Sequence, residues 1–315
     1  MKIGLLNCGG TITESYQADG TIKRLLARDL IALSGKTGWI GYDIDPVDSC
    51  DLTFASLCRA RDVMRQDRES EAFVMCCGTD AMEDAAYAAA LLFDRDRPVV
   101  VTGAAIPGDN ANADGPRNLA DAANLARAMP QGASALVAFA GRIFDPVSIV
   151  KIWPQAIQPF GPETAIRGSI EADIVTLTGS GVVEESYSKL DVADLGARVA
   201  IVMETFGSLV GFPDISTLDG IVVAGKGAGG FSALSERLLS EAAAHIPVVL
   251  STRCAHGFRV NPAVTKYAYD RAHKLGLITA GYDGLNASKA RIRLIAELGV
   301  VPVAAKRRRA DQLRE

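Results

Sequence analysis

Two glycines precede Thr11 directly after an apolar run near the start of the chain. Gly9 and Gly10 allow a sharp backbone turn, so a hydroxyl placed after them would lie near oriented N–H groups. This arrangement suits attack of a threonine oxygen on a carbonyl carbon, whose developing charge the N–H groups of the turn would stabilise. The alternative is a plain glycine turn followed by β-branched residues.

A second motif begins at Gly78, where Thr79 and Asp80 stand at the junction of a strand and a helix. A hydroxyl beside a carboxylate there could hold an ammonium group or position a water molecule. The alternative is helix capping, because Asp80 and Glu83 have the spacing of a capping box. A third motif, at residues 102–119, contains Asp-Gly-Pro, which is typical of a turn that opens a helix.

Lys151 is an isolated lysine flanked by Val150, Ile152 and Trp153. These apolar neighbours predict partial burial, and desolvation would lower the pKa of Lys151 and make it a possible base. The alternative is an ordinary surface lysine. The three histidines have no metal-ligand spacing, and no Gly-x-Ser-x-Gly elbow occurs. We therefore predict a reaction that uses no metal and no cofactor.

Short apolar runs bounded by turns predict the strands that position these motifs. The runs are Lys2–Cys8, Ala72–Cys77, Pro98–Thr102, Ala135–Ala140 and Ile174–Leu177. Helical patterns at Met82–Phe93 and Pro116–Ala128 alternate with them, which predicts an open, doubly wound parallel α/β sheet. Ligands bind such sheets at loops that leave the carboxyl ends of strands, and the three motifs stand there.

A second α/β set follows a polar segment without clear periodicity. Its expected strands are Arg198–Glu204, Gly220–Gly225, Ile246–Ser251 and Leu277–Ala280, and its expected helices are Ala233–Ala244, Ala263–Leu275 and Ala287–Leu298. A chain of 315 residues exceeds the usual size of one hydrophobic core. We predict an N-terminal domain at residues 1–178, a linker at 179–196 and a C-terminal domain at 197–315.

The composition excludes several classes of protein. The net charge is −4 and no basic stripe with interleaved aromatics occurs, so we expect no nucleic-acid partner. The basic residues 306–309 are interpreted as a solvated tail. No run approaches the ~18 apolar residues of a membrane helix, and the N-terminal run is too short for a signal peptide. The six cysteines match no zinc pattern, which indicates reduced thiols in a cytoplasmic protein.

Taken together, the motifs resemble the bacterial-type L-asparaginase/glutaminase family over nearly the whole chain. Residues 9–12 and 78–83 look like its two threonine signatures, and residues 113–119, 251–253 and 287–293 resemble further blocks. The resemblance implies hydrolysis of the side-chain amide of L-asparagine, or of a related amino-acid amide, through a threonine acyl-enzyme. It also implies a larger flavodoxin-like domain, a smaller Rossmann-like α/β domain, and a homo-oligomer, either a dimer or a tetramer.

The resemblance assigns roles to individual residues. Thr11 would be the nucleophile, and Thr79, Asp80 and Lys151 would form a polar relay. Tyr16 matches a tyrosine that activates or covers the nucleophile from a mobile loop. The substrate-binding positions implied are Gly10, Ser49, Cys50, Gly78 and Ala104.

Several positions depart from the family pattern. Cys8 stands where threonine is usual, Cys77 where histidine is usual, and Ala81 where threonine is common. Cys50 replaces a glutamine or another polar residue that often contacts the substrate. The acidic residue that a neighbouring subunit contributes has no clear counterpart, although residues 269–270 fall near that place. We therefore predict amide hydrolysis by a protein that keeps the family's catalytic residues but differs from it at residues that recognise the substrate.

Two other functions are consistent with parts of the sequence. Gly225–Gly230 satisfies G-x-G-x-x-G after an expected strand, and Arg253 could meet a 2′-phosphate, as in an NADP-dependent oxidoreductase. Against this, the usual acidic residue is missing and the motif lies late in the chain. A non-catalytic amino-acid-binding protein on the same scaffold is the other alternative, and the retained Thr11 and Lys151 argue against it.

Overall fold

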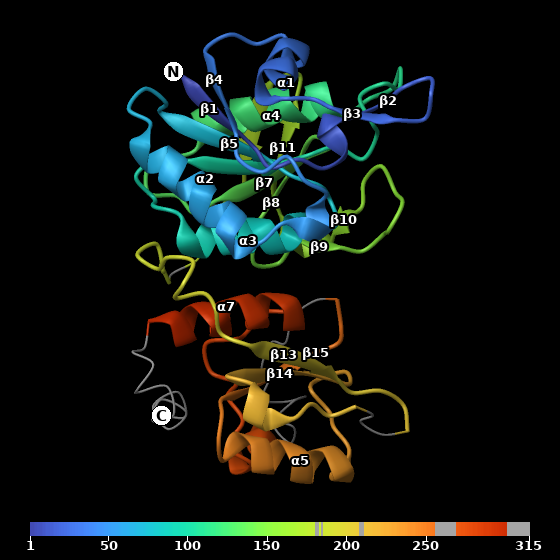
Figure 1. Cartoon of the computed structure of the whole chain (residues 1–315), viewed down its shortest axis with the longest axis vertical. Coiled ribbons are helices and arrows are strands. Elements are labelled where there is room, and N and C mark those ends of the chain that lie inside the picture. The colour runs from blue at the N-terminus through green and yellow to red at the C-terminus, as the bar shows by residue number, and fades with distance from the viewer. Residues whose placement is uncertain (180–182, 184, 208–210, 256–268, 301–315) are drawn as a thin grey trace. The chain divides into compact units, whose positions relative to one another are not determined.

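The computed structural model describes residues 1–179, 183, 185–207, 211–255 and 269–300 of the chain. The chain folds into two compact units, Met1–Ser188 (unit 1) and Lys189–Glu315 (unit 2) (Figure 1). Val183 and Tyr187 donate backbone hydrogen bonds to Ser134 and Leu91, so this segment packs on unit 1. The boundaries at 178 and 196 stay a prediction.

Unit 1 contains one large sheet and two small hairpins. Its strands are β1 (Ile3–Asn7), β2 (Glu14–Tyr16), β3 (Ile22–Arg24), β4 (Trp39–Asp43), β5 (Ala72–Cys76), β6 (Val99–Thr102), β7 (Leu136–Phe139), β8 (Arg142–Phe144), β9 (Val150–Lys151), β10 (Phe160–Gly161), β11 (Ile166–Glu171) and β12 (Ile174–Leu177). Its α-helices are α1 (Ala27–Ser34), α2 (Phe54–Gln66), α3 (Met82–Leu92) and α4 (Gly115–Ala128).

The large sheet has the order β12-β11-β8-β7-β6-β5-β1-β4. Strands β4, β1, β5, β6 and β7 pair in parallel. Among these five strands β4 follows β1 in the sequence but lies outside it in the sheet. This is the flavodoxin-like order, with its switch point between β1 and β5, and it confirms the predicted fold class. Asn7 pairs with Cys76 in this register, so both strands end side by side at the switch point.

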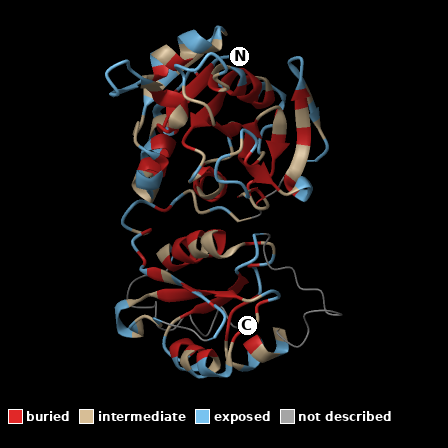
Figure 2. Cartoon of the chain, turned by 90° about the vertical axis from the view of Figure 1, so that its right-hand side faces the viewer, coloured by how far each residue is buried: buried red, intermediate tan, exposed pale blue. Residues whose placement is uncertain are grey.

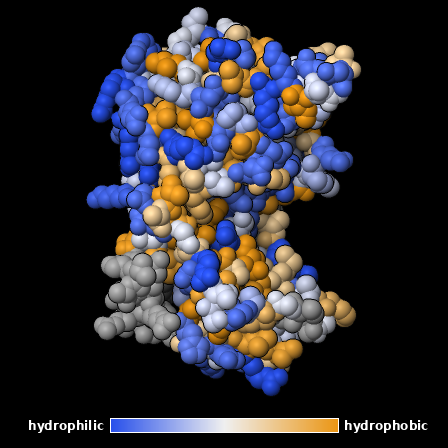
Figure 3. Space-filling view, viewed as in Figure 1, coloured by the Kyte–Doolittle hydropathy of each residue, from blue (hydrophilic) through white to orange (hydrophobic). Residues whose placement is uncertain are grey.

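Helices cover both faces of the parallel strands, with α1 and α4 on one face and α2 and α3 on the other (Figure 1). Every residue of β1, β5, β6 and β7 is buried (Figure 2). Strands covered on both faces are apolar throughout, which explains why the sequence pattern found these four. Over the face of unit 1 in Figure 3, hydrophilic residues are interspersed with small groups of apolar ones.

One predicted strand has a different place. Ile174–Leu177 was expected as a buried parallel strand, but β12 pairs antiparallel with β11 at the edge of the sheet, and Ile174 is 69% exposed. The reason is the two-residue turn between them, where Ala172 and Asp173 have φ of 48° and 67°. Two residues with positive φ form the tight turn of an antiparallel hairpin, whereas a parallel connection needs many more residues.

Unit 2 has a three-stranded parallel sheet of β13 (Val199–Met203), β14 (Gly220–Gly225) and β15 (Val248–Thr252). The helices α5 (Ala233–Ala243) and α7 (Ala287–Gly299) lie on opposite faces (Figure 1). This order confirms the predicted smaller Rossmann-like α/β fold. The expected strand Leu277–Ala280 is reduced to a single parallel bridge between Ile278 and Val249.

Part of the expected helix Ala263–Leu275, at residues 263–268, lies outside the described residues, and 269–274 are helical. The basic residues 306–309 also lie outside them. Within the described ranges, no helix is both long and apolar enough to cross a membrane.

Asp67 is the C-cap residue directly after α2, and its carboxylate accepts four hydrogen bonds. The donors are the N–H groups of Glu69 (2.6 Å) and Ser70 (2.9 Å), the Ser70 hydroxyl and the Tyr42 hydroxyl (2.9 Å). Burial alone would raise the pKa of Asp67, but these bonds outweigh it and lower the pKa to about 2. The carboxylate therefore stabilises the fold wherever it is ionised.

Replacing Asp67 with asparagine is expected to lower the free energy of unfolding by about 2 kcal/mol at pH 7. Because the folded pKa is depressed below the ordinary value of 3.8, this stability is present above pH 4 and is lost as pH falls toward 2. Urea unfolding at pH 7 and pH 3 measures the difference. The surface variant Asp96→Asn should cost less than about 0.5 kcal/mol. A loss at Asp67 that does not shrink at pH 3 would contradict this account.

Candidate active site

The glycine turn after β1 meets the loop after β5 at the switch point. Gly9 and Gly10 have φ of +83° and +81°, which favour glycine. A Cβ on Gly10 would lie 2.1 Å from the Gly78 nitrogen, so the two backbones are in direct contact. Thr11 and Thr79 are the next residues after these glycines. The structure thus brings the first two sequence motifs together.

The N–H groups of both glycines are used within the turn. Gly10 N–H donates to the Val47 carbonyl (2.9 Å), and Gly9 N–H donates to Asn7 Oδ1 (3.1 Å). The expectation that these two groups face a substrate carbonyl was therefore wrong, because each already has an acceptor. Thr11 begins the 3-10 helix η1 (Thr11–Thr13), and the first N–H groups of a helix lack acceptors within it.

Ser49 and Cys50 lie in a second 3-10 helix, η2 (Ser49–Asp51). Ser49 is buried, and a Cβ on Gly78 would lie 2.7 Å from its hydroxyl oxygen. Ser49, Gly10 and Gly78 therefore share one contact region. Cys50 is exposed, its N–H donates to Asp48 Oδ1 (2.9 Å), and a side-chain hydrogen bond with Asp48 raises the pKa of its thiol.

Lys151 connects the loop after β5 with β9. Its Nζ donates to Thr79 Oγ1 (2.9 Å) and forms an ion pair with Asp80, and its side chain is 15% exposed. Glu83, in the first turn of α3, accepts the Lys151 backbone N–H. The N-cap of α3 is Ala81, without a side-chain bond, so the capping interpretation of Asp80 was wrong. Asp80 instead pairs with a lysine far along the chain.

Tyr16 is the last residue of β2 and is 48% exposed. Its hairpin is fastened to the loop after β6, because Tyr16 N–H donates to Asp109 Oδ1 (3.0 Å) and Gly108 N–H donates to the Glu14 carbonyl (2.9 Å). The hairpin rejoins the core at Leu25, whose N–H donates to the Thr13 carbonyl (2.7 Å). Tyr16 is thus carried on a hairpin fastened at both ends of its base, close to η1.

Ala104 follows β6, and its side chain is buried in the apolar core. Any contact with substrate, which stays a prediction, would use its backbone. Asp114 accepts the N–H groups of Ala105 (3.0 Å) and Ile106 (2.9 Å), and Asn118 donates to the Gly103 carbonyl (3.0 Å). The third motif therefore fastens this loop to the start of α4, with Pro116 in its first turn, as predicted.

All six cysteines are free thiols. Cys8, Cys76 and Cys77 are fully buried behind the two loops, and burial raises the pKa of each, to about 12 for Cys76. These thiols are protonated at neutral pH and do not compete with a hydroxyl as nucleophile. Across the described residues, no three His, Cys, Asp or Glu side chains gather as a metal site would require.

The glycine-rich loop of unit 2 is poorly suited to a dinucleotide. Lys226 and Gly230 exchange both backbone hydrogen bonds, so their N–H groups are not available to phosphate. Ser232 caps α5 by accepting Ser235 N–H, which occupies the helix start where a pyrophosphate would bind. The buried carboxylate of Glu204 lies 3.4 Å from Lys226 Nζ and would repel phosphate. This geometry weighs against the NADP-dependent alternative.

The fold and site define a two-unit α/β protein with hydroxyl, ammonium and carboxylate groups at a flavodoxin-like switch point. Residues 2–180 match the family "Asparaginase, N-terminal", and residues 213–309 match the "Glutaminase/Asparaginase C-terminal domain". The chain therefore belongs to the asparaginase family, and it is an asparaginase-like amidohydrolase.

Individual relatives span nearly the whole chain. The probable L-asparaginase of Deinococcus radiodurans is 30% identical over 316 residues, covering 95% of this chain and 93% of that one. The probable cytoplasmic L-asparaginase of Campylobacter jejuni has a crystal structure with a TM-score of 0.78 at 25% identity, covering 99% and 98% of the two chains. The thermostable L-asparaginase of Thermococcus kodakarensis shares the fold, with a TM-score of 0.81 at 24% identity and coverage of 100% and 96%.

Proposed function

We propose that the protein hydrolyses the side-chain amide of L-asparagine, or of a related amino-acid amide, through an acyl-enzyme on Thr11. The observation that supports this most is the contact between the Gly10 turn and Gly78. This contact brings the turn that precedes Thr11 against the loop whose Thr79 binds Lys151 Nζ. A threonine hydroxyl is a weak nucleophile at neutral pH and needs a neighbouring proton acceptor, a role that we assign to the relay of Thr79, Asp80 and Lys151 as a whole.

In the proposed first step, Thr11 Oγ attacks the amide carbon and its proton passes to the leaving nitrogen. The carbon–nitrogen bond breaks, ammonia leaves, and an ester on Thr11 remains. Water then attacks the ester, which restores the threonine hydroxyl and releases the acid. The proposed relay of Thr79, Asp80 and Lys151 moves protons in both steps, and Tyr16 covers or activates Thr11. In each step one bond to the carbonyl carbon forms, one breaks and a proton is transferred, and nothing is oxidised or reduced. The proposal therefore includes no metal or cofactor.

The substrate is proposed to contact the region that Gly10, Ser49 and Gly78 share, with Cys50 and the Ala104 backbone at its border. In this proposal, N–H groups at the start of η1 would stabilise the oxyanion. Cys50 has only a weakly polar thiol where a polar contact to the amino-acid end of the substrate is expected. For this reason we propose an asparagine-type amide and leave a related amide as the alternative outcome.

Ammonia release tests the proposal. The purified protein and the Thr11→Ala variant would be assayed with asparagine, glutamine, their D-forms and several small amides, before and after dialysis against a chelator. We expect release from at least one amide, loss of release in the variant, and no effect of the chelator. No release from any amide by folded wild-type protein would contradict the proposal and favour an amino-acid-binding protein.

We also propose a homo-oligomer. Ile152, Trp153 and Ile157 follow Lys151 and are 40%, 60% and 59% exposed, so a second copy could cover this apolar segment beside the site. Mass photometry should find a dimer or tetramer that Trp153→Glu dissociates, whereas Trp39→Phe, distant in sequence, should not. An active monomer would contradict this part of the proposal.

The cytoplasm is the proposed location. The free thiols and the cytoplasmic relative from Campylobacter jejuni support it. Cell fractionation that finds the protein outside the cytoplasm would contradict it. Neither a membrane nor a nucleic acid is part of the proposal.

A further inference from the structure

Asn7 is a fully buried amide at the carboxyl end of β1. Its Oδ1 accepts the Gly9 N–H (3.1 Å), and its Nδ2 donates to Asp43 Oδ1 (2.8 Å) and to the Leu25 carbonyl (3.3 Å). The Cys76 thiol also donates to Oδ1 (3.5 Å). One side chain therefore binds two donors and two acceptors that belong to four separate segments.

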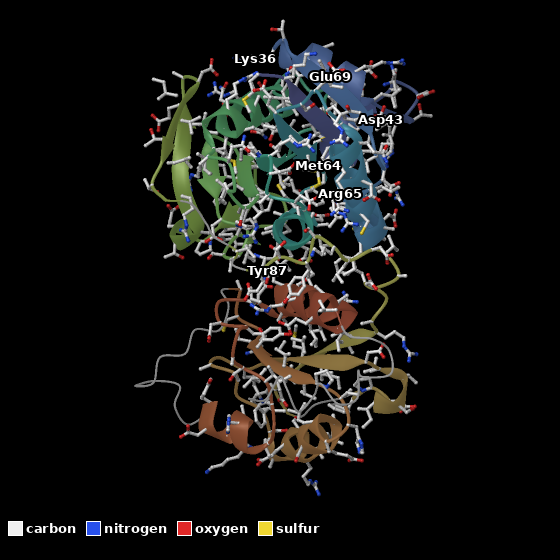
Figure 4. The ribbon with its side chains drawn as sticks, turned by 90° about the vertical axis from the view of Figure 1, so that its left-hand side faces the viewer. Lys36, Asp43, Met64, Arg65, Glu69 and Tyr87 are labelled. Carbon is white, nitrogen blue, oxygen red and sulfur yellow. The ribbon has the colours of Figure 1, made fainter. Side chains whose placement is uncertain are left out.

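Two of these segments carry residues of the proposed site, and a third ends the edge strand β4. Gly9 belongs to the turn that presents Thr11. Leu25 closes the base of the hairpin that carries Tyr16, because it follows β3 and donates to the Thr13 carbonyl (2.7 Å). Asp43, labelled in Figure 4, ends β4 and also accepts the Ala27 N–H at the start of α1 (2.8 Å). Asn7 thus joins the nucleophile turn, the tyrosine hairpin and the edge of the sheet.

Among the described residues, Asn7 supplies the side-chain acceptor for the Gly9 N–H. A Cβ there would lie 2.0 Å from the Val47 carbonyl oxygen, so the turn is packed tightly and a small rotation changes its contacts. Without Asn7 the buried Gly9 N–H would lose its acceptor, which is unfavourable in the interior. The turn would then reorganise, and the hydroxyl of Thr11 would move relative to Thr79.

We propose that Asn7 is a positioning residue for catalysis, which orients the Thr11 turn and the base of the Tyr16 hairpin through its bonds to Gly9, Leu25 and Asp43. This inference rests on the proposed role of Thr11 as the nucleophile. The side-chain hydrogen bonds of Asn7 join it to Gly9, Leu25, Asp43 and Cys76, which are not among the residues proposed for the relay or for substrate binding. Its loss is therefore expected to lower kcat while KM changes little.

The Asn7–Asp43 pair allows a sharp exchange test. Asn7→Asp retains an acceptor for Gly9 but places two carboxylates in contact, with Cys76 as the other titratable group facing them. This variant is expected to lower kcat about 10- to 100-fold, as a small displacement of a reacting group does. The double exchange Asn7→Asp with Asp43→Asn restores one amide and one carboxylate in contact. It is expected to recover part of the lost kcat but not all of it, because a carboxylate at position 7 cannot donate to the Leu25 carbonyl.

The control is Ser134→Ala, which removes a buried hydrogen bond to Val183 N–H (3.1 Å) elsewhere in unit 1 and should leave kcat unchanged. Hydrogen exchange without substrate supplies a readout independent of activity. In Asn7→Asp the amide hydrogens of residues 9–13 should exchange with solvent faster than in wild type. In the variant that combines Asn7→Asp with Asp43→Asn they should exchange more slowly again. Wild-type kcat in folded Asn7→Asp, or a double exchange no better than the single variant, would overturn the proposal. If wild type hydrolyses no amide, the exchange rates alone decide whether Asn7 holds the turn.

Discussion

Replacing Thr11 with valine is expected to lower kcat for amide hydrolysis at least about 1,000-fold, as removal of the nucleophile does in other acyl-transfer enzymes. Valine has nearly the shape of threonine, so the change removes the hydroxyl and little else. Thr11 is only partly buried at the start of η1, which limits any effect on packing. Steady-state ammonia release and urea unfolding of the same preparation would measure both effects.

Two further variants separate the hydroxyl from the fold. Thr11→Ser retains a nucleophilic oxygen and should retain activity well above that of the valine variant. Thr21→Val alters an exposed threonine on the hairpin, whose hydroxyl donates to Asp19 (2.7 Å), and should leave kcat unchanged. If Thr11→Val kept more than a tenth of wild-type kcat, another group would have to be the nucleophile.

Replacing Lys151 with methionine is expected to lower kcat about 100- to 10,000-fold, the range that a positioned proton-transfer group contributes. The methionine side chain has a similar length and retains the apolar stem, but it cannot donate to Thr79 or pair with Asp80. Both kcat and kcat/KM should fall, because the relay acts in the transition state. Stability should change by less than about 1 kcal/mol, since Asp80 is 64% exposed and such pairs contribute little.

Lys36→Met is the matched control. Lys36, labelled in Figure 4, lies 3.5 Å from Asp173 in a surface ion pair, and its side chain is 35% exposed. Its loss removes one lysine and one ion pair without touching Thr79 or Asp80. Equal activity losses in the two lysine variants would contradict the relay, because they would point to a general effect of charge.

The position of the site could be predicted from sequence because its two main loops follow buried strands. Every residue of β1 and β5 is buried, so their sequences are continuous apolar runs that end at glycines. Parallel strands end at the same edge of a sheet, and the motifs at Thr11 and Thr79 had to meet there. The partial burial expected for Lys151 from its apolar neighbours is also present.

Other features could not be predicted, because they depend on contacts between distant segments. The strand β4 and the helices α1 and α2 were missed, and β4 is only half-buried, with no continuous apolar run. Without β4, nothing in the sequence indicated that Asp43 faces Asn7. A polar residue at the end of an otherwise apolar strand was the only signal for Asn7. The use of both glycine N–H groups inside the turn likewise depends on Val47, which no motif includes.

Locating the acyl group measures the central claim most directly. The protein would be mixed with the amide that it hydrolyses best, quenched in acid within milliseconds, digested and analysed by mass spectrometry. We predict that the mass of the acyl group appears on the peptide that contains Thr11, and that Thr11→Val abolishes it. An acyl group on Thr79, or steady turnover without any acylated peptide, would contradict the proposed role of Thr11.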